Sequence, residues 1–298
     1  MVDVAKAHLF SSVLSEIRRT LEKHGFCELL TPSLLRNAPV PYRAPYQLID
    51  QKLNDLAVGQ PATESIALAL KDLQAVYSIQ TIYRLADKGP NHLQEFHYVK
   101  LGMRAYLPTL LDLVEGIAGT IGRMVTHGSP SDPPKRLTFD DARTLLNSPK
   151  GADITLAQQL QLVDLAGPKS ASVSVMNRPK VFEPLQYDVD TAAPVFNADI
   201  LMRHCGEVGG GYQVAVGRAS AAYQASEYRQ EALRQGMVDI DSCAGAYVRT
   251  VDGLSDPICL GGFSFERLMQ SSLGVADIAD VPVFSGAASI MCGGSAMT

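Results

Sequence analysis

The chain has 298 residues, enough for one large domain or two small ones with a substantial buried core. Apolar residues make up 46% of it and charged residues 19%, a balance that excludes wholesale disorder. The net charge is -5, and no run of Lys and Arg is long enough to form a basic stripe, which argues against tight binding to nucleic acid.

The cysteines and the hydropathy pattern indicate a cellular compartment. No C-x-x-C pair occurs among the five cysteines, Cys27, Cys205, Cys243, Cys259 and Cys292. An odd number without zinc spacing favours reduced thiols. The first residues lack the basic and apolar segments of a signal peptide, and no apolar run approaches the roughly 20 residues of a membrane span. We therefore expect a soluble, cytoplasmic protein.

The first predicted element is an amphipathic helix. Apolar side chains recur at spacings of three and four, the period of one helix face, at Phe10, Val13, Leu14, Ile17 and Leu21. Gly25 is expected to end this helix. Residues 26–30 then read as a short strand closed by Pro32, and a second helix is expected over residues 61–74.

A long antiparallel hairpin is predicted next, because two apolar, aromatic runs, 75–83 and 95–106, flank a polar segment. Later helices are expected at 108–126, about 138–147, 155–165, near 218–235 and after Gly262, with a loose, glycine-rich tail at 285–298. Hairpins without a regular βαβ period indicate an α+β fold, an antiparallel β-sheet flanked by helices.

Three segments carry chemical motifs. The first is G-F-C-E-L-L-T-P at 25–32, and the second is V-Y-S-I-Q-T-I-Y-R at 76–84, followed after a polar loop by H-L-Q-E-F at 92–96. The third is G-G-F-S-F-E-R-L at 261–268. In this order they resemble the three motifs of class II aminoacyl-tRNA synthetases, and the resemblance covers residues 1–284.

Four further segments resemble the asparaginyl subgroup. L-A-V-G-Q at 56–60, with Glu64 after it, is similar to V-S-G-Q-x-x-x-E, and R-L-T-F-D-D-A at 136–142 is similar to R-I-T-Y-x-E-A. N-R-P-K at 177–180 is similar to N-Y-P-K, and Asp199, eight residues before Glu207, matches an acidic pair. The resemblance implies one catalytic domain over 1–298, without the N-terminal OB-fold barrel that reads the anticodon.

The resemblance also implies how ATP would bind. Arg84 would contact the α-phosphate, where negative charge develops, and Arg267 the γ-phosphate; these are the two expected catalytic residues. His92 would reach the outer phosphates, and Phe96 would stack on adenine. Gly262 would let the backbone approach the nucleotide. Taken singly, each arginine would more often lie on the surface and Phe96 in the core, but their ordered occurrence favours the functional interpretation.

The expected cofactors are therefore ATP and Mg²⁺. Asp199 and Glu207 would hold Mg²⁺ on the triphosphate, a task that suits hard carboxylate oxygens. Gln60 and Glu64 would orient the ammonium group of an amino-acid substrate. His97 and His204, which lack spaced partners, are expected to be structural.

The substrate pocket departs from the family pattern. Val214 stands seven residues after Glu207, where the family has an arginine that grips the substrate. Lys100 and Gly102 stand where the family carries acidic residues. These changes predict a substrate side chain other than that of asparagine, either anionic or bulkier. Ala86 and Ser264 are departures within the ATP motifs themselves.

The resemblance implies an ATP-dependent ligase. It would activate an amino acid, or a related carboxylic acid, as an acyl-adenylate and transfer it to a non-tRNA nucleophile such as ammonia or an amine, as free-standing asparagine synthetases do. One alternative is a non-catalytic paralogue that binds a ligand or protein partner. Another is aminoacylation of a carrier protein or of a tRNA acceptor stem. The first motif implies a homodimer, and the missing anticodon domain argues against tRNA as a partner.

Overall fold

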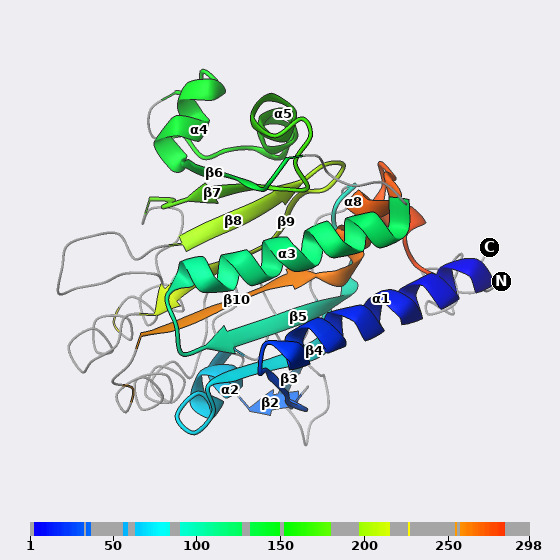
Figure 1. The fold of residues 1–298 in the computed structure, drawn as a ribbon, viewed down its shortest axis with the longest axis vertical. Helices are drawn as coiled ribbons and strands as arrows, with labels where there is room; N and C mark the ends of the chain where they lie inside the picture. Colours follow the sequence, from blue (N-terminus) through cyan, green and yellow to red (C-terminus); the bar gives the residue numbers. More distant parts are fainter. Residues whose placement is uncertain are drawn as a thin grey trace, which may run out of the picture.

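The computed structural model describes residues 3–32, 34–36, 56–58, 63–83, 90–126, 132–149, 152–179, 197–214, 226, 254 and 257–283. An eight-stranded sheet forms its centre (Figure 1). From edge to edge its strands are β1 (Cys27–Glu28), β4 (Ala75–Tyr83), β5 (Glu95–Met103), β10 (Ile258–Ser264), β9 (Gly206–Val214), β8 (Asn197–Met202), β7 (Val173–Met176) and β6 (Lys135–Thr138). A separate hairpin-like pair joins β2 (Leu34–Arg36) to β3 (Leu56–Val58).

The predicted α+β class is confirmed, with one addition at the sheet edges. The six central strands, from β4 to β7, pair antiparallel, whereas β1 pairs with β4 and β6 pairs with β7 in parallel. The predicted hairpin is present, with Ala75 opposite Met103 and Tyr83 opposite Glu95. Its second strand ends at Met103, three residues earlier than predicted, and the next backbone N–H, that of Arg104, donates to Gln74 O at 2.8 Å.

Three helices cover one face of the sheet, which we call the helix face: α1 (Val4–Lys23), α3 (Leu107–Thr126) and α8 (Phe265–Leu273). Figure 1 shows α1 and α3 lying over the same side of the sheet, with their axes roughly along β5 and β10. Asp3 caps α1 by accepting a hydrogen bond from the Lys6 N–H at 3.0 Å, and Gly25, at φ +79°, follows its end. The predicted apolar stripe lies in the core, where Val13, Ile17 and Leu21 are fully buried.

A buried carboxylate fastens α3 to the far edge of the sheet. Glu115 accepts hydrogen bonds from Arg136 Nε at 3.1 Å and Nη2 at 2.7 Å, and from Ser174 Oγ at 2.6 Å. Glu115 is buried, and a buried charge is tolerated where it is paired and hydrogen-bonded, as this carboxylate is. The contact therefore fixes β6 and β7 to the helix that spans the central strands.

The opposite face of the sheet is covered at its two ends. Near β4, Ile66 of helix α2 (Thr63–Ala69) and Leu70, directly after the helix, pack against Val76, Val214 and Leu260. Near β7, helices α4 (Phe139–Leu145) and α5 (Leu156–Ala166) enclose a second apolar cluster. Thr155 and Gln158 form a capping box at the start of α5. The strands between these two clusters carry the residues that the sequence singled out.

Some predicted elements are shorter than expected or cannot be compared. The first strand spans only Cys27–Glu28, and α2 ends at Ala69, because residues 70–72 turn toward β4. The predicted helix near 218–235, apart from Ser226, and the tail at 285–298 lie outside the described residues. Among the described helices, none is both long and apolar enough to cross a membrane.

Candidate functional site

A row of four residues crosses the middle of the sheet on the face opposite α3. Lys100 on β5 lies opposite Gly262 on β10, which lies opposite Gly210 on β9, which lies opposite Asp199 on β8. Residues directly opposite each other in antiparallel strands point to the same face. We call this side the site face, and it presents a cation at one end of the row, an anion at the other, and bare backbone between them.

The two central glycines follow from the packing around them. A Cβ atom on Gly262 would overlap Val99 O and the ring of Tyr98, and one on Gly210 would overlap Ala198 O. Any larger side chain would push the strands apart. The sheet therefore has a stretch of backbone without side chains at Gly262 and Gly210, the glycine floor, and the Tyr98 ring packs against it at Gly262.

A bulge brings Glu207 to the same face as Asp199. The register between β8 and β9 shifts between Ile200 and Leu201, so that Leu201 lies opposite Glu207. Val208, the extra residue, packs in the core beneath the helix face. Without this bulge the alternation along β9 would direct Glu207 into the core. The predicted acidic pair thus depends on a feature that the eight-residue spacing does not reveal.

Arg267 lies beside Glu207, at the start of α8. The helix follows β10 directly, and Ser264 caps it by accepting from the Arg267 N–H at 3.3 Å. The Arg267 guanidinium donates from Nη1 to Glu207 O at 2.8 Å and from Nε to Asn91 O at 3.2 Å. It therefore joins the end of the hairpin loop to β9, while remaining partly exposed.

Lys100 is a buried cation on the site face, only 6% exposed. Its Nζ lies 5.7 Å from the centroid of the Tyr212 ring, in a cation–π contact. Phe96 lies four residues before Lys100 on β5, points to the same face and is half-buried. His92 is exposed and lies shortly before the strand. Val214, by contrast, is buried in the cluster beneath α2, opposite Ile258.

Between these residues, His97 points to the helix face and binds Glu266. The Glu266 carboxylate accepts from the His97 backbone N–H at 2.9 Å and contacts His97 Nδ1 at 2.7 Å. The hydrogen bond to Glu266 raises the pKa of His97, against the opposing effect of burial. His97 is thus structural, as its lack of spaced partners suggested, and it holds the strand that carries Phe96 against α8.

The sequence profile described as tRNA synthetases class II (D, K and N) matches residues 4–287. This chain belongs to that family. Its fold is accordingly the class II synthetase fold. The second motif lies on the hairpin of β4 and β5, and the third lies on β10 and α8. No curated protein sequence matches the chain significantly.

Solved synthetase structures share the fold at low sequence identity. Asparaginyl-tRNA synthetase from Pyrococcus horikoshii, complexed with asparaginyl-adenylate, superposes with a TM-score of 0.76 at 20% identity, over 94% of this chain and 68% of that one. The Entamoeba histolytica enzyme, also with asparaginyl-adenylate, gives 0.75 at 18% identity, over 94% and 66%. The chain thus spans about two thirds of the length of these synthetases.

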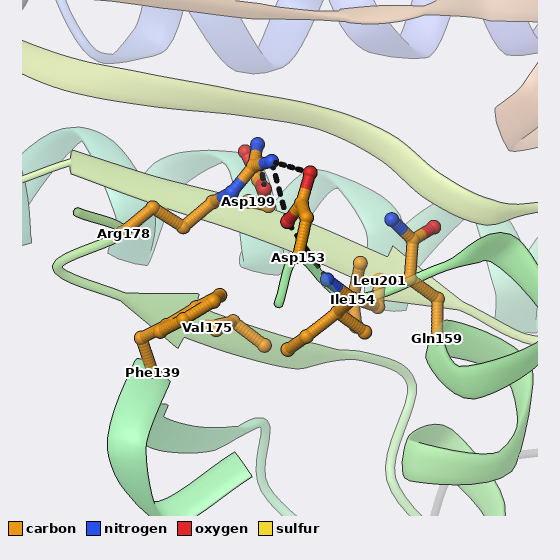
Figure 2. A pocket seen from close by; sticks show the side chains of 8 residues that line it. All are labelled: Phe139, Asp153, Ile154, Gln159, Val175, Arg178, Asp199 and Leu201. Carbon is orange, nitrogen blue, oxygen red and sulfur yellow. Dashed lines mark hydrogen bonds and ion pairs between the residues drawn. The ribbon is translucent and has the colours of Figure 1, made fainter. Parts of the chain in front are cut away.

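Within the synthetase family pattern, Asp199 was expected to hold Mg²⁺, but its carboxylate already binds a cation. Arg178 Nη1 donates to Asp199 Oδ2 at 2.9 Å, and Arg178 Nη2 donates to both carboxylate oxygens of Asp153 at 2.9 and 2.8 Å (Figure 2). No group of three or more His, Cys, Asp or Glu side chains within the described ranges could hold a metal ion. The guanidinium of Arg178 therefore occupies the Asp199 oxygen that a metal ion would need on this side, and the arrangement does not fit a metal bound there.

Sequence reasoning placed Arg178 only within the N-R-P-K segment and missed Asp153 altogether. The single signal was a charged residue in the second place of a motif that resembles N-Y-P-K. Its partners lie 21 and 25 residues away in the chain, so no local spacing pointed to them. Of the other predicted residues, Arg84 and Gln60 lie outside the described part of the chain, and Glu64 lies in α2 with its side chain not described.

Proposed function

We propose that this chain is an ATP-dependent ligase that activates an amino acid as an acyl-adenylate. The observation that carries the proposal is the site face itself, where a glycine floor runs between Lys100 and Asp199 with Arg267 at its border. A flat, polar surface flanked by fixed cations suits a nucleotide and a carboxylic acid that must meet in one orientation. Membership of the class II synthetase family supports the same reaction.

The proposed chemistry needs positioning and charge compensation from the protein. A carboxylate oxygen of the substrate attacks the α-phosphorus of ATP, the bond to the bridging oxygen breaks, and pyrophosphate leaves. Arg84 and Arg267 would stabilise the negative charge that develops on the phosphate oxygens. Phe96 would stack on adenine and His92 would approach the outer phosphates. No protein nucleophile is required.

The substrate side chain is proposed to be anionic. Lys100 places a buried ammonium group on the site face, and a buried cation binds an anion more strongly than an exposed one does. The other sequence-based possibility, a bulkier side chain in the place of a lost arginine, is less well supported, because Val214 packs under α2. Gln60 and Glu64 are proposed to orient the ammonium group of the amino acid.

The acceptor is proposed to be ammonia or another small amine. Its nitrogen would attack the acyl carbon of the adenylate, the acyl–phosphate bond would break, AMP would leave, and the excess proton would pass to solvent. Aminoacylation of tRNA is the competing function, since the similar structures are asparaginyl-tRNA synthetases. A non-catalytic role remains the second alternative, and retention of Phe96, Glu207 and Arg267 argues against it.

A product analysis tests the acceptor. The purified chain is incubated with ATP, an acidic amino acid and ammonium chloride, and in parallel with bulk tRNA in place of ammonium, and the products are identified by mass spectrometry. We expect AMP and a free amide in the first reaction and no aminoacyl ester on tRNA in the second. An aminoacyl ester without amide would reverse the proposed acceptor, and absence of AMP in both reactions would favour the non-catalytic paralogue.

Lys100→Gln is the matched variant for the substrate side chain. It keeps a polar side chain of similar reach and removes the positive charge. We expect its AMP formation with an acidic amino acid to fall on the order of a hundredfold, as for removal of one partner of a buried ion pair. Unchanged AMP formation would exclude Lys100 from substrate binding.

A further inference from the structure

The Asp199 end of the glycine floor holds a fixed guanidinium where the family resemblance places a metal ion. Arg178 contacts two carboxylates at once, those of Asp199 and Asp153, and all three side chains border one small pocket beside α5 (Figure 2). The guanidinium and Asp199 are 14% and 18% exposed. Such a shielded pair interacts more strongly than a surface pair, because solvent screens it less.

Hydrogen bonds hold the backbone of Arg178 in place, as ion pairs hold its guanidinium. Its N–H donates to Asn197 Oδ1 at 2.7 Å, and its carbonyl accepts from Asn197 Nδ2 at 3.2 Å. The preceding residue, Asn177, adopts a left-handed conformation at φ +62° and donates to Asn197 O at 2.9 Å. Asn197 itself is buried at the start of β8. The side chain therefore reaches Asp199 from a rigid base with little conformational entropy left to lose.

Charge and space both favour the guanidinium over a metal ion at Asp199. A divalent cation could meet the Asp199 carboxylate only by approaching the Arg178 guanidinium, which carries a charge of the same sign. A magnesium ion would also need carboxylate oxygens at about 2.1 Å, on the side that Arg178 Nη1 and Nη2 already occupy. Removal of the guanidinium would take this positive charge away from both carboxylates, which border the same pocket, and would favour a divalent cation there.

We propose that Arg178 is a resident counter-cation which takes the place of a divalent metal ion at Asp199. The positive charge at this end of the floor would then be permanent and independent of the concentration of metal. The inference goes beyond the proposed ligase reaction, because it concerns how the charge of Asp199 is compensated and holds whether or not an adenylate forms.

Binding of Mn²⁺ to the full chain without nucleotide, followed by electron paramagnetic resonance of the free ion, tests this assignment. Wild type and Asp199→Asn should bind Mn²⁺ identically, because the guanidinium already occupies Asp199. Arg178→Gln should bind Mn²⁺ on the order of tenfold more tightly than wild type. The double variant Arg178→Gln/Asp199→Asn should lose that gain, and Arg178→Lys, which keeps the charge, should not show it.

Two results would overturn the proposal. One is a wild-type Mn²⁺ site that Asp199→Asn removes, a comparison that does not depend on the folding of any Arg178 variant. The other is a folded Arg178→Gln protein, checked by circular dichroism, with wild-type Mn²⁺ affinity. Since no measurement involves ATP or turnover, failure here is distinguishable from failure of the proposed ligase activity.

Discussion

The contact between His97 on β5 and Glu266 on α8 makes the stability of the fold depend on the protonation state of His97. Glu266 is buried and accepts from both the backbone N–H and the ring of His97, and this hydrogen bond raises the pKa of His97 above its usual value of about 6.5. A raised pKa in the folded state means that folding favours protonated His97. The corresponding stability is fully present below the unfolded pKa and is lost as the pH rises through the folded pKa.

We therefore predict that His97→Gln flattens the pH dependence of unfolding. Between pH 6 and pH 9, wild type should lose up to about 1 kcal/mol of unfolding free energy relative to the variant, a modest value because the His97 side chain is 51% exposed. Urea unfolding at several pH values measures the difference. His8→Gln, which removes an exposed imidazole from α1, is the control and should keep the wild-type profile. Parallel profiles for wild type and His97→Gln would show that the contact has no such effect.

Arg267 serves the fold as well as the proposed reaction. Its guanidinium donates to the carbonyls of Asn91 and Glu207, and so joins the hairpin loop to β9. We predict that Arg267→Ala abolishes ATP binding and also lowers the free energy of unfolding by about 2 kcal/mol, since two charge-assisted hydrogen bonds are lost. Arg267→Lys should recover part of the stability and little of the ATP binding, because an ammonium group lacks the planar fork.

Calorimetric titration of ATP and urea unfolding of the same preparations measure both effects. Wild-type ATP affinity in folded Arg267→Ala would contradict the proposed phosphate contact while leaving the structural role standing.

At the scale of elements, the glycine floor depends on how closely β5, β10 and β9 approach. We predict that Gly262→Ala lowers the free energy of unfolding by about 1–3 kcal/mol, since its methyl group would overlap Val99 O and the Tyr98 ring. The control is Gly122→Ala in α3, where an added Cβ meets nothing within 4 Å. That change should be neutral or stabilising by about 1 kcal/mol, because alanine is the better helix former. Equal effects of the two substitutions in urea unfolding would contradict this account of the floor.

Elements with a strong local pattern could be predicted from the sequence. The first hairpin strand has the predicted bounds, 75–83, because apolar runs and a polar turn define it locally. The stripe that contains Val13, Ile17 and Leu21 likewise identified the buried side of α1. These features depend on residues that are close together in the chain, so the local sequence pattern is enough to predict them.

Features that depend on distant segments could not be predicted. The parallel pairings of β1 with β4 and of β6 with β7 join strands separated by long stretches of chain. The bulge at Ile200/Leu201 turns Glu207 to the site face, although alternation alone would not place it there. The ion pair that engages Asp199 comes from Arg178, which no spacing rule connects to a metal ligand. Tertiary contacts decide each of these.

For the whole molecule, the sheet edge at β1 bears on assembly. Both residues of β1 are exposed, and Leu30, two residues after its end, is fully exposed at 100%. A short, exposed edge beside an apolar side chain is a ready surface for a second copy of the chain. The resemblance of the first motif to a synthetase dimer segment favours the same arrangement, a two-fold interface.

We predict that the chain is a homodimer and that Leu30→Asp makes it a monomer. A carboxylate buried in an apolar contact would cost more free energy than such an interface gains on association. Light scattering coupled to size-exclusion chromatography gives the mass of each protein. Leu165→Asp, an equally drastic change at an exposed position on α5 near the far edge of the sheet, should leave the dimer intact. A monomeric wild type would contradict the prediction.

Adenylate formation is a property of the whole site, because it needs the motif arginines, the glycine floor and the amino-acid pocket together. Exchange of labelled pyrophosphate into ATP, with the purified chain and a panel of amino acids supplied one at a time, measures this reaction without assuming any acceptor. We predict exchange that is stimulated by an amino acid with an anionic side chain and abolished by Arg267→Ala. Absence of exchange with every acid, together with no detectable ATP binding, would contradict it and identify the chain as a non-catalytic member of the synthetase family.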